Sequence, residues 1–248
     1  MSFDKKMELF DKIFNLQYEL QKEEKFAHSK EPVMHLIYHL FLRYRRSLKT
    51  MKIILESKEI ENSYIETLPL LRIQLETYFH IVYITEHEDK ALCVKEYENL
   101  QKLQLYKIAK SFRSFDNEFP GRLSNQEKQF MEMYEDDKPS DTVPHLAFLK
   151  QLAEEAAKKK EDYTRIYSLL SSFVHYNPST RVAYSNHKEN EIVYNQFVYD
   201  ENVENVVLKY ATGFALNTIT YINKLLKVKR IEEMNDNLLL TEWQKLFR

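Results

Sequence analysis

The sequence predicts an all-α protein, a multi-helix bundle, and three observations support that fold class. Only two glycines and six prolines occur in 248 residues, so the chain lacks the turn residues that β-sandwiches and α/β folds need. Apolar residues recur every three or four positions over long stretches, which is the period of an amphipathic helix. Hydrophobic residues make up 44% of the chain and aromatic residues 13%, enough to fill a sizeable core. We therefore expect a single helical domain over residues 1–248.

Residues 1–60 are predicted to form a pair of helices. Apolar side chains recur at helical spacing in the first of them, over residues 3–27. Pro32 suits the first turn of the second helix. His35 and His39 stand four residues apart on that second helix, a spacing that can offer two imidazoles to a metal ion. No third ligand is evident, so we expect no metal site and interpret both as structural or surface histidines.

The second helix also carries a basic run that includes one aromatic residue, Arg43-Tyr44-Arg45-Arg46. In one interpretation, Arg43 and Arg46 bind phosphates while the tyrosine stacks on a nucleobase. In the other, the run is an ordinary solvated helix face. Consecutive helix residues point in different directions, so the arginines cannot all serve one site.

Residues 61–230 are expected to form the core of the bundle, and residues 231–248 a docking tail. The predicted helices of the core cover 68–84, 89–115, 124–134, 145–159, 163–175 and 201–230. Between the last two, residues 181–184 and 191–195 can pair as a small β-hairpin, although a plain loop fits almost as well. The tail is rich in leucine and contains Trp243. A segment this apolar is expected to pack against another surface. We expect the apolar termini to bind a protein partner or a second copy of the chain.

Two formally charged side chains lie on the apolar helix over residues 68–84. Arg72 and Glu76 are one turn apart at the edge of its apolar stripe. We expect them to be half-buried and paired. The alternative is an ordinary surface pair, which contributes about 0.2–0.5 kcal/mol.

The helix that ends near His175 has small hydroxyl side chains along one side. These are Thr164, Ser168, Ser171 and Ser172. A solvated helix face is normally rich in Lys and Glu, so we expect another element to cover this one. Asn177 and Pro178 then end the helix, because the residue before a proline is displaced from the α region.

Together these positions resemble a bacterial helical family of unknown function. The pattern is R-x-x-x-E at Arg72 and Glu76, then, about ninety residues later, Y-x-x-x-S-x-x-x-H at Tyr167, Ser171 and His175, followed by N-P-S. That family is grouped with abortive-infection and HEPN-like proteins, which are nucleotide-binding or similar to RNase toxins. The resemblance spans residues 64–184 and implies antiviral defence and RNA binding. Catalytic HEPN domains carry an arginine, four to six residues and then a histidine, and no arginine precedes His175 at that spacing.

Composition limits the remaining possibilities. The formal net charge of −2 gives no global attraction to nucleic acid or to membranes, so such binding must be local. Cys93 is the single cysteine, which excludes an intrachain disulfide and fits a reducing cytosol. No segment has the pattern of a signal peptide or a membrane span, and glycine-rich phosphate loops are absent. We expect a cytoplasmic protein without a cofactor and without membrane binding.

Two functional hypotheses follow. In the first, the chain acts on RNA or a nucleotide, with His175 as acid or base, Arg72 as phosphate clamp and Glu76 orienting Arg72, as in a HEPN-like ribonuclease. The ligand-binding residues are then Tyr167, Ser171, Arg181, Arg43 and Arg46. In the second, the same residues form a buried polar network that fixes helix register, and the chain is a non-catalytic interaction or scaffold module. Both hypotheses require the helices over 68–84 and 163–175 to lie side by side in a largely dry place.

Overall fold

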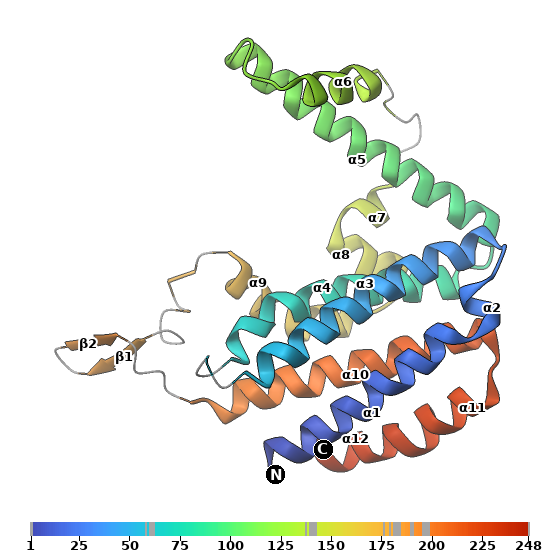
Figure 1. Ribbon diagram of the computed structural model, residues 1–248, viewed down its shortest axis with the longest axis vertical. Helices are drawn as coiled ribbons and strands as arrows, with labels where there is room; N and C mark the ends of the chain where they lie inside the picture. The colour runs from blue at the N-terminus through green and yellow to red at the C-terminus, as the bar shows by residue number, and fades with distance from the viewer. Residues whose placement is uncertain are drawn as a thin grey trace.

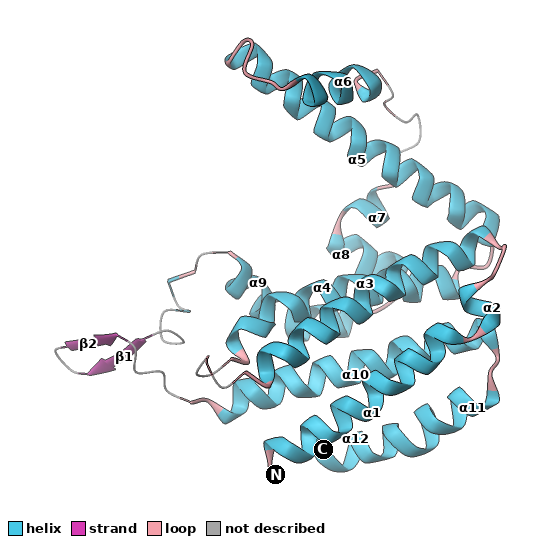
Figure 2. Ribbon diagram, in the orientation of Figure 1, coloured by secondary structure: helices cyan, strands magenta, loops and turns pink. Residues whose placement is uncertain are grey.

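The computed structural model describes residues 2–57, 59, 63–136, 138, 143–175, 177–178, 180, 185–188, 191–194 and 199–247. For residues 185–188 and 191–194 it describes the backbone alone. Over these ranges the chain is almost entirely helical, so the predicted all-α class is confirmed (Figures 1 and 2). Among the helices so described, none combines the length and apolarity that crossing a bilayer requires.

Four long helices form the centre of the bundle. They are α1 (Phe3–Lys22), α3 (Pro32–Leu55), α4 (Leu68–Glu86) and α10 (Glu201–Leu226). Helix α4 packs against both α3 and α10, and α1 packs against α10 (Figure 1). Buried apolar side chains from Met7 to Leu239 join into one hydrophobic cluster. Because α4 is enclosed by its neighbours, any polar side chain along it must find a partner or reach the rim.

Two short elements complete this half of the bundle. Helix α2 (Glu24–Ala27) follows α1, and the 3-10 turn η1 (Ile65–Thr67) leads into α4. Phe26 from α2 is buried beside Tyr38 and Phe41 of α3. The aromatic contacts therefore fix the connection between the two N-terminal helices.

The next two helices are α5 (Lys90–Glu118) and α6 (Asn125–Tyr134). The outer part of α5 and the whole of α6 project from the bundle as an arm, defined here as residues 103–134 (Figure 1). Phe112 and Phe130 hold the two helices together, with ring centroids 5.8 Å apart. The predicted capping box of α6 is present, because Ser124 and Glu127 satisfy each other's backbone amides.

The predicted helix over residues 145–159 is broken into three pieces. They are α7 (Pro144–Ala147), α8 (Leu149–Gln151) and the π-helical η2 (Leu152–Ala156). Phe148 adopts an extended conformation, with φ −117° and ψ 120°, and so interrupts the helix. Helix α9 (Lys160–Val174) then packs against α4.

The small hairpin is not found as predicted. Strand β2 (Glu191–Tyr194) pairs antiparallel with β1 (Ser185–Lys188), which lies in the segment expected to be the connection. Residues 181–184, the expected first strand, lie outside the described residues.

The C-terminal tail returns along α10 of its own chain. It consists of α11 (Lys229–Glu232), the π-helical η4 (Glu233–Leu239) and α12 (Leu240–Phe247). Trp243 donates its indole N–H to the backbone oxygen of Lys209, 3.2 Å away, and to the hydroxyl of Thr212, 3.0 Å away. Gly213 gives the indole room, because a Cβ there would lie 3.1 Å from the ring. Binding of a partner by the termini stays a prediction.

Candidate functional site

The guanidinium of Arg72 joins helices α4 and α9. Its Nε donates to Glu76 Oε1 at 3.2 Å, and Nη2 donates to the Tyr167 hydroxyl at 3.2 Å. Its Nη1 lies 3.3 Å from His175 Nε2. The two helices therefore meet as expected across about a hundred residues of chain. That these four residues bind or catalyse stays a prediction.

This contact assigns a role to each ring nitrogen of His175. A guanidinium has only hydrogen-bond donors, so a hydrogen bond between Arg72 and His175 has Nε2 as its acceptor and corresponds to the tautomer with its proton on Nδ1. The Arg72 carbon Cζ also lies 5.1 Å from the centroid of the Tyr167 ring, so the cation is held by a π face as well as by hydrogen bonds.

The expectation of a dry site is wrong. The Arg72 and Glu76 side chains are 18% and 29% exposed, which confirms a half-buried pair, but His175 lies at the surface. Helix α9 ends at Val174, and His175 is already extended with φ −103° and ψ 141°. The imidazole is therefore carried out of the helix interface while its Nε2 still reaches Arg72.

The hydroxyl face of α9 is also more open than expected. Thr164 and Ser168 are exposed, and Ser171 and Ser172 are half-buried, so none of the described elements covers this side. A shallow pocket of about 350 Å³ lies here, lined by Ser168, Ser171, Ser172, His175, Asn177 and Pro178. The predicted residue Ser171 therefore belongs to a pocket wall next to the imidazole.

The basic run on α3 is divided between the surface and the core, and ligand binding by Arg43 and Arg46 stays a prediction. Arg43 and Arg46 are exposed, but Tyr44 is fully buried in the core and cannot stack on a nucleobase. Arg45 instead lies over the rings of Phe14 and Tyr18 of α1. The interpretation of the run as a stacking and phosphate-binding motif is therefore wrong for its aromatic residue.

The remaining residues considered from the sequence are not part of the contacts around Arg72 in the described structure. Arg181 lies outside the described residues. His35 Nε2 is 2.6 Å from the backbone oxygen of Ser29, and His39 is exposed. Across the described ranges, no three His, Cys, Asp or Glu side chains are grouped so that they could hold a metal ion.

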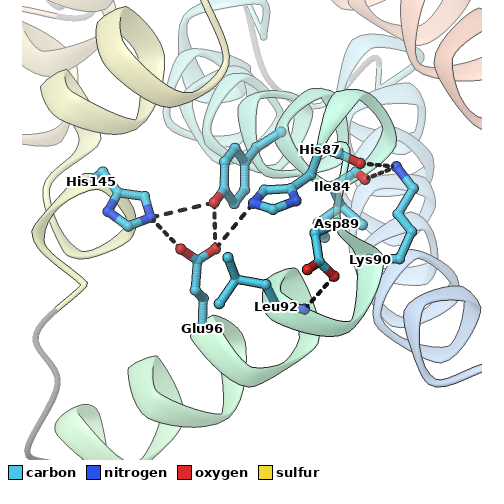
Figure 3. A network of polar contacts seen from close by, with 8 residues as sticks. Ile84, His87, Asp89, Lys90, Leu92, Glu96 and His145 are labelled. Atoms are coloured by element: carbon cyan, nitrogen blue, oxygen red, sulfur yellow. Dashed lines mark hydrogen bonds and ion pairs between the residues drawn. The ribbon is translucent and has the colours of Figure 1, made fainter.

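A second polar cluster, which sequence reasoning missed, lies at the other end of α4 (Figure 3). The carboxylate of Glu96 on α5 accepts a hydrogen bond from the Tyr83 hydroxyl. It also lies 3.3 Å from His145 Nε2 of α7 and 3.7 Å from His87 Nε2. Glu96 is 17% exposed, so three separate elements meet at one half-buried carboxylate.

A sequence signal for this cluster exists. From Arg72 onwards, α4 carries ionisable side chains at residues 72, 76, 80 and 83, and His87 follows directly after the helix. Steps of three and four residues keep them on one helix face. The prediction from sequence covers only the first turn of this face, at Arg72 and Glu76.

His80 lies between the two clusters on the same face of α4. Its Nδ1 is 2.8 Å from the Tyr97 hydroxyl of α5. Burial, with the positive charge of Arg43 as a lesser cause, lowers the pKa of His80 to about 4. Burial likewise raises the pKa of the Cys93 thiol to about 12, so this cysteine is not an activated nucleophile.

The fold and these contacts define an all-helical protein with an Arg–Tyr–His centre at the open edge of two packed helices. Residues 34–192 match a family of unknown function, DUF5677, and since this is more than half of the chain, the chain belongs to that family. The expected relation to a family of unknown function is confirmed, whereas the match itself carries no link to HEPN-like proteins. Comparison with curated proteins and with solved structures gave no match. Both polar clusters of α4 lie within the matched residues.

Proposed function

We propose that the chain binds RNA or a nucleotide at the Arg72–His175 centre, in a bacterial defence role of the abortive-infection type. The observation that carries the proposal is the contact between a held guanidinium and a surface imidazole beside a hydroxyl-lined pocket. A guanidinium, an imidazole and serine hydroxyls are together suited to a phosphate group.

The Arg72 side chain is preorganised to bind an oxyanion. Glu76 and Tyr167 engage Nε and Nη2, so the fork is oriented before any ligand arrives. Orientation by neighbours reduces the entropy lost on binding. Nη1 points to the surface imidazole of His175 and is the donor that an arriving phosphate reaches with least rearrangement.

The same contact brings an arginine and a histidine together across the fold. In HEPN-like ribonucleases the arginine and histidine lie a few residues apart on one chain segment, whereas here Arg72 of α4 approaches His175 after α9. When a phosphate draws Arg72 Nη1 towards itself, His175 Nε2 is released and acts as general base on a ribose 2′-hydroxyl. The 2′-oxygen then attacks phosphorus, the 5′-oxygen leaves with a proton from water, and Arg72 stabilises the added negative charge.

Cleavage and binding of a fluorescently labelled RNA test the proposal. We expect His175→Ala to abolish cleavage but weaken binding by less than about tenfold. Arg72→Ala should weaken binding by tenfold or more, equivalent to about 1.4 kcal/mol. His39→Ala, which removes an exposed imidazole elsewhere, is the matched control and should change neither. No binding of RNA or of nucleotides by the unmodified protein would refute the proposal.

The second candidate is a non-catalytic interaction module that forms a homodimer. The observation in its favour is the apolar surface of the arm, where Ile108, Phe115 and Met133 are 46%, 41% and 67% exposed. A net charge of −2 opposes self-association only weakly. Light scattering after size exclusion tests this. We expect a dimer that Phe115→Asp converts to a monomer, and a monomeric unmodified protein would exclude it.

A further inference from the structure

A second pocket lies far along the chain from the Arg72 centre and outside the residues that match the family. It has a volume of about 510 Å³ and is bounded by α10 on one side and by α11 and η4 on the other. Ile219 and Ile231, both fully buried, contribute apolar surface, while Thr220, Asn223 and Asn235 contribute polar atoms. This size and mixture are typical of small-molecule sites.

The end of the pocket near the helix turn is basic and rigid. Asn223 clamps the turn, because its Oδ1 accepts from the Val228 amide at 3.1 Å and its Nδ2 donates to the Val228 carbonyl at 3.2 Å. Lys227 and Lys229 flank Val228 and make no ion pair within the described ranges. Two free ammonium groups therefore stand at a fixed turn.

The other end of the pocket holds an unsatisfied acceptor. Asn235 is 1% exposed, and its Nδ2 donates to Thr220, to Asp236 and to the backbone of Leu216 at 2.8, 2.8 and 3.3 Å. Since three acceptors surround this nitrogen, the orientation of the amide is determined. The Asn235 Oδ1 atom is buried and has no partner in the described structure. A buried acceptor without a donor is rare and calls for an explanation.

The backbone around Asn235 is itself unusual. Residues Glu233–Leu239 form a π-helical segment, which turns Asn235 and Asp236 towards α10. π-Helical segments are rare in proteins overall, and those that do occur are often found at functional sites. Thr220 and Lys227 are seven residues apart on α10, so the acceptor end and the basic end are separated by about 10 Å at 1.5 Å per residue.

We propose that this pocket binds an elongated small molecule with an acidic group at one end and an N–H or O–H donor at the other. The acidic group pairs with Lys227 and Lys229, and the donor satisfies Asn235 Oδ1 beside Asp236. This site is independent of the proposed RNA or nucleotide site. A nucleoside monophosphate and the zwitterion of a short peptide share this chemistry, and the experiment separates them.

Calorimetric titration of the full chain with adenosine 5′-monophosphate and with trialanine tests the proposal. We expect saturable binding of one probe, weakened at least tenfold by the double variant Lys227→Asn/Lys229→Gln. Asparagine tolerates the left-handed conformation of Lys227, which has φ 55°, so this variant should fold. Lys49→Gln, an exposed lysine on α3, is the control and should bind as the unmodified protein does.

Two further variants separate the ends of the pocket and the two sites. Asn235→Ala should weaken binding about threefold to tenfold, with the melting temperature measured beside it because three hydrogen bonds are lost as well. The titrations are repeated with Arg72→Ala, which removes the guanidinium of the proposed nucleotide site, and binding at this pocket should persist. Absence of binding by both probes would overturn the pocket proposal. So would binding that Arg72→Ala abolishes and the double lysine variant preserves, because that binding belongs to the Arg72 centre.

Discussion

The half-buried imidazole of His80 should make the protein less stable in mild acid. The folded state holds the pKa of His80 at about 4, against about 6.5 for an exposed histidine. Between pH 6.5 and pH 4, His80 is therefore protonated in the unfolded chain but neutral in the folded chain. The free energy of unfolding decreases as the pH falls through this range. Above pH 6.5 this pH-dependent loss of stability is absent.

The magnitude follows from the two pKa values. Linkage over this interval gives a loss of roughly 3 kcal/mol in total, of which about 2 kcal/mol is lost between pH 7 and pH 5. For a chain of this length that corresponds to a fall of about 4–8 °C in melting temperature. His80→Gln keeps a polar side chain near Tyr97 but cannot be protonated, so it should remove this part of the pH dependence.

Urea unfolding followed by far-ultraviolet circular dichroism at pH 7, 6 and 5 measures the effect. The His80→Gln variant should lose about 2 kcal/mol less than the unmodified protein over this range. His39→Gln, which changes an exposed histidine on α3, should follow the unmodified protein. Parallel pH curves for His80→Gln and the unmodified protein would show that His80 is not held neutral by burial.

Three other substitutions test particular contacts. Glu96→Gln removes the carboxylate shared by one tyrosine and two histidines, and should lower stability by about 1–3 kcal/mol in urea unfolding; a loss below about 0.5 kcal/mol would mean that the cluster contributes nothing. Gly213→Ala improves helix propensity by about 1 kcal/mol but brings a Cβ to 3.1 Å from Trp243, so we expect little net change in stability together with a red shift of indole fluorescence. An unchanged spectrum would contradict that contact. Ser124→Ala should remove about 1 kcal/mol from α6 alone, seen as faster amide exchange in residues 125–134 with exchange in α4 unaltered.

Much of the fold could be predicted because local signals agree with the packing. Apolar spacing placed the four central helices, and the capping pattern at Ser124 fixed the start of α6. Periodicity failed over residues 144–156, where the backbone of Phe148 becomes extended. Spacing shows which residues can share a face, but it cannot show where packing stops a helix.

Periodicity also failed along α5. Its apolar spacing predicts that Leu92 and Ile108 face the core, but they are 48% and 46% exposed. An amphipathic pattern indicates an apolar face without indicating what lies opposite it. From residue 103 onwards that face of α5 is only partly covered, because the helix leaves the bundle as the arm, and this accounts for the exposure of Ile108.

The candidate site could be predicted in part for a related reason. The pairing of Arg72 with Glu76 is local and follows from their spacing. Their meeting with Tyr167 and His175 depends on how α9 packs, and it was inferred only from the family pattern. The exposure of His175 depends on α9 ending at Val174, before the proline that was expected to end it. The Glu96 cluster joins three elements and has no local motif beyond the spacing on α4.

The junction between α4 and α5 sets the direction of the arm. Lys90 Nζ donates to the carbonyls of Ile84 and His87 at 2.9 and 2.6 Å, and Asp89 accepts from the Leu92 amide at 2.9 Å (Figure 3). Lys90 Nζ also donates to the carbonyl of Thr85 at 2.9 Å. Lys90 thus caps the end of α4 while Asp89 caps the start of α5. The short connection therefore restricts changes in the angle between the two helices. Inserting one residue here would rotate α5 by about 100° about its axis and re-aim the whole arm.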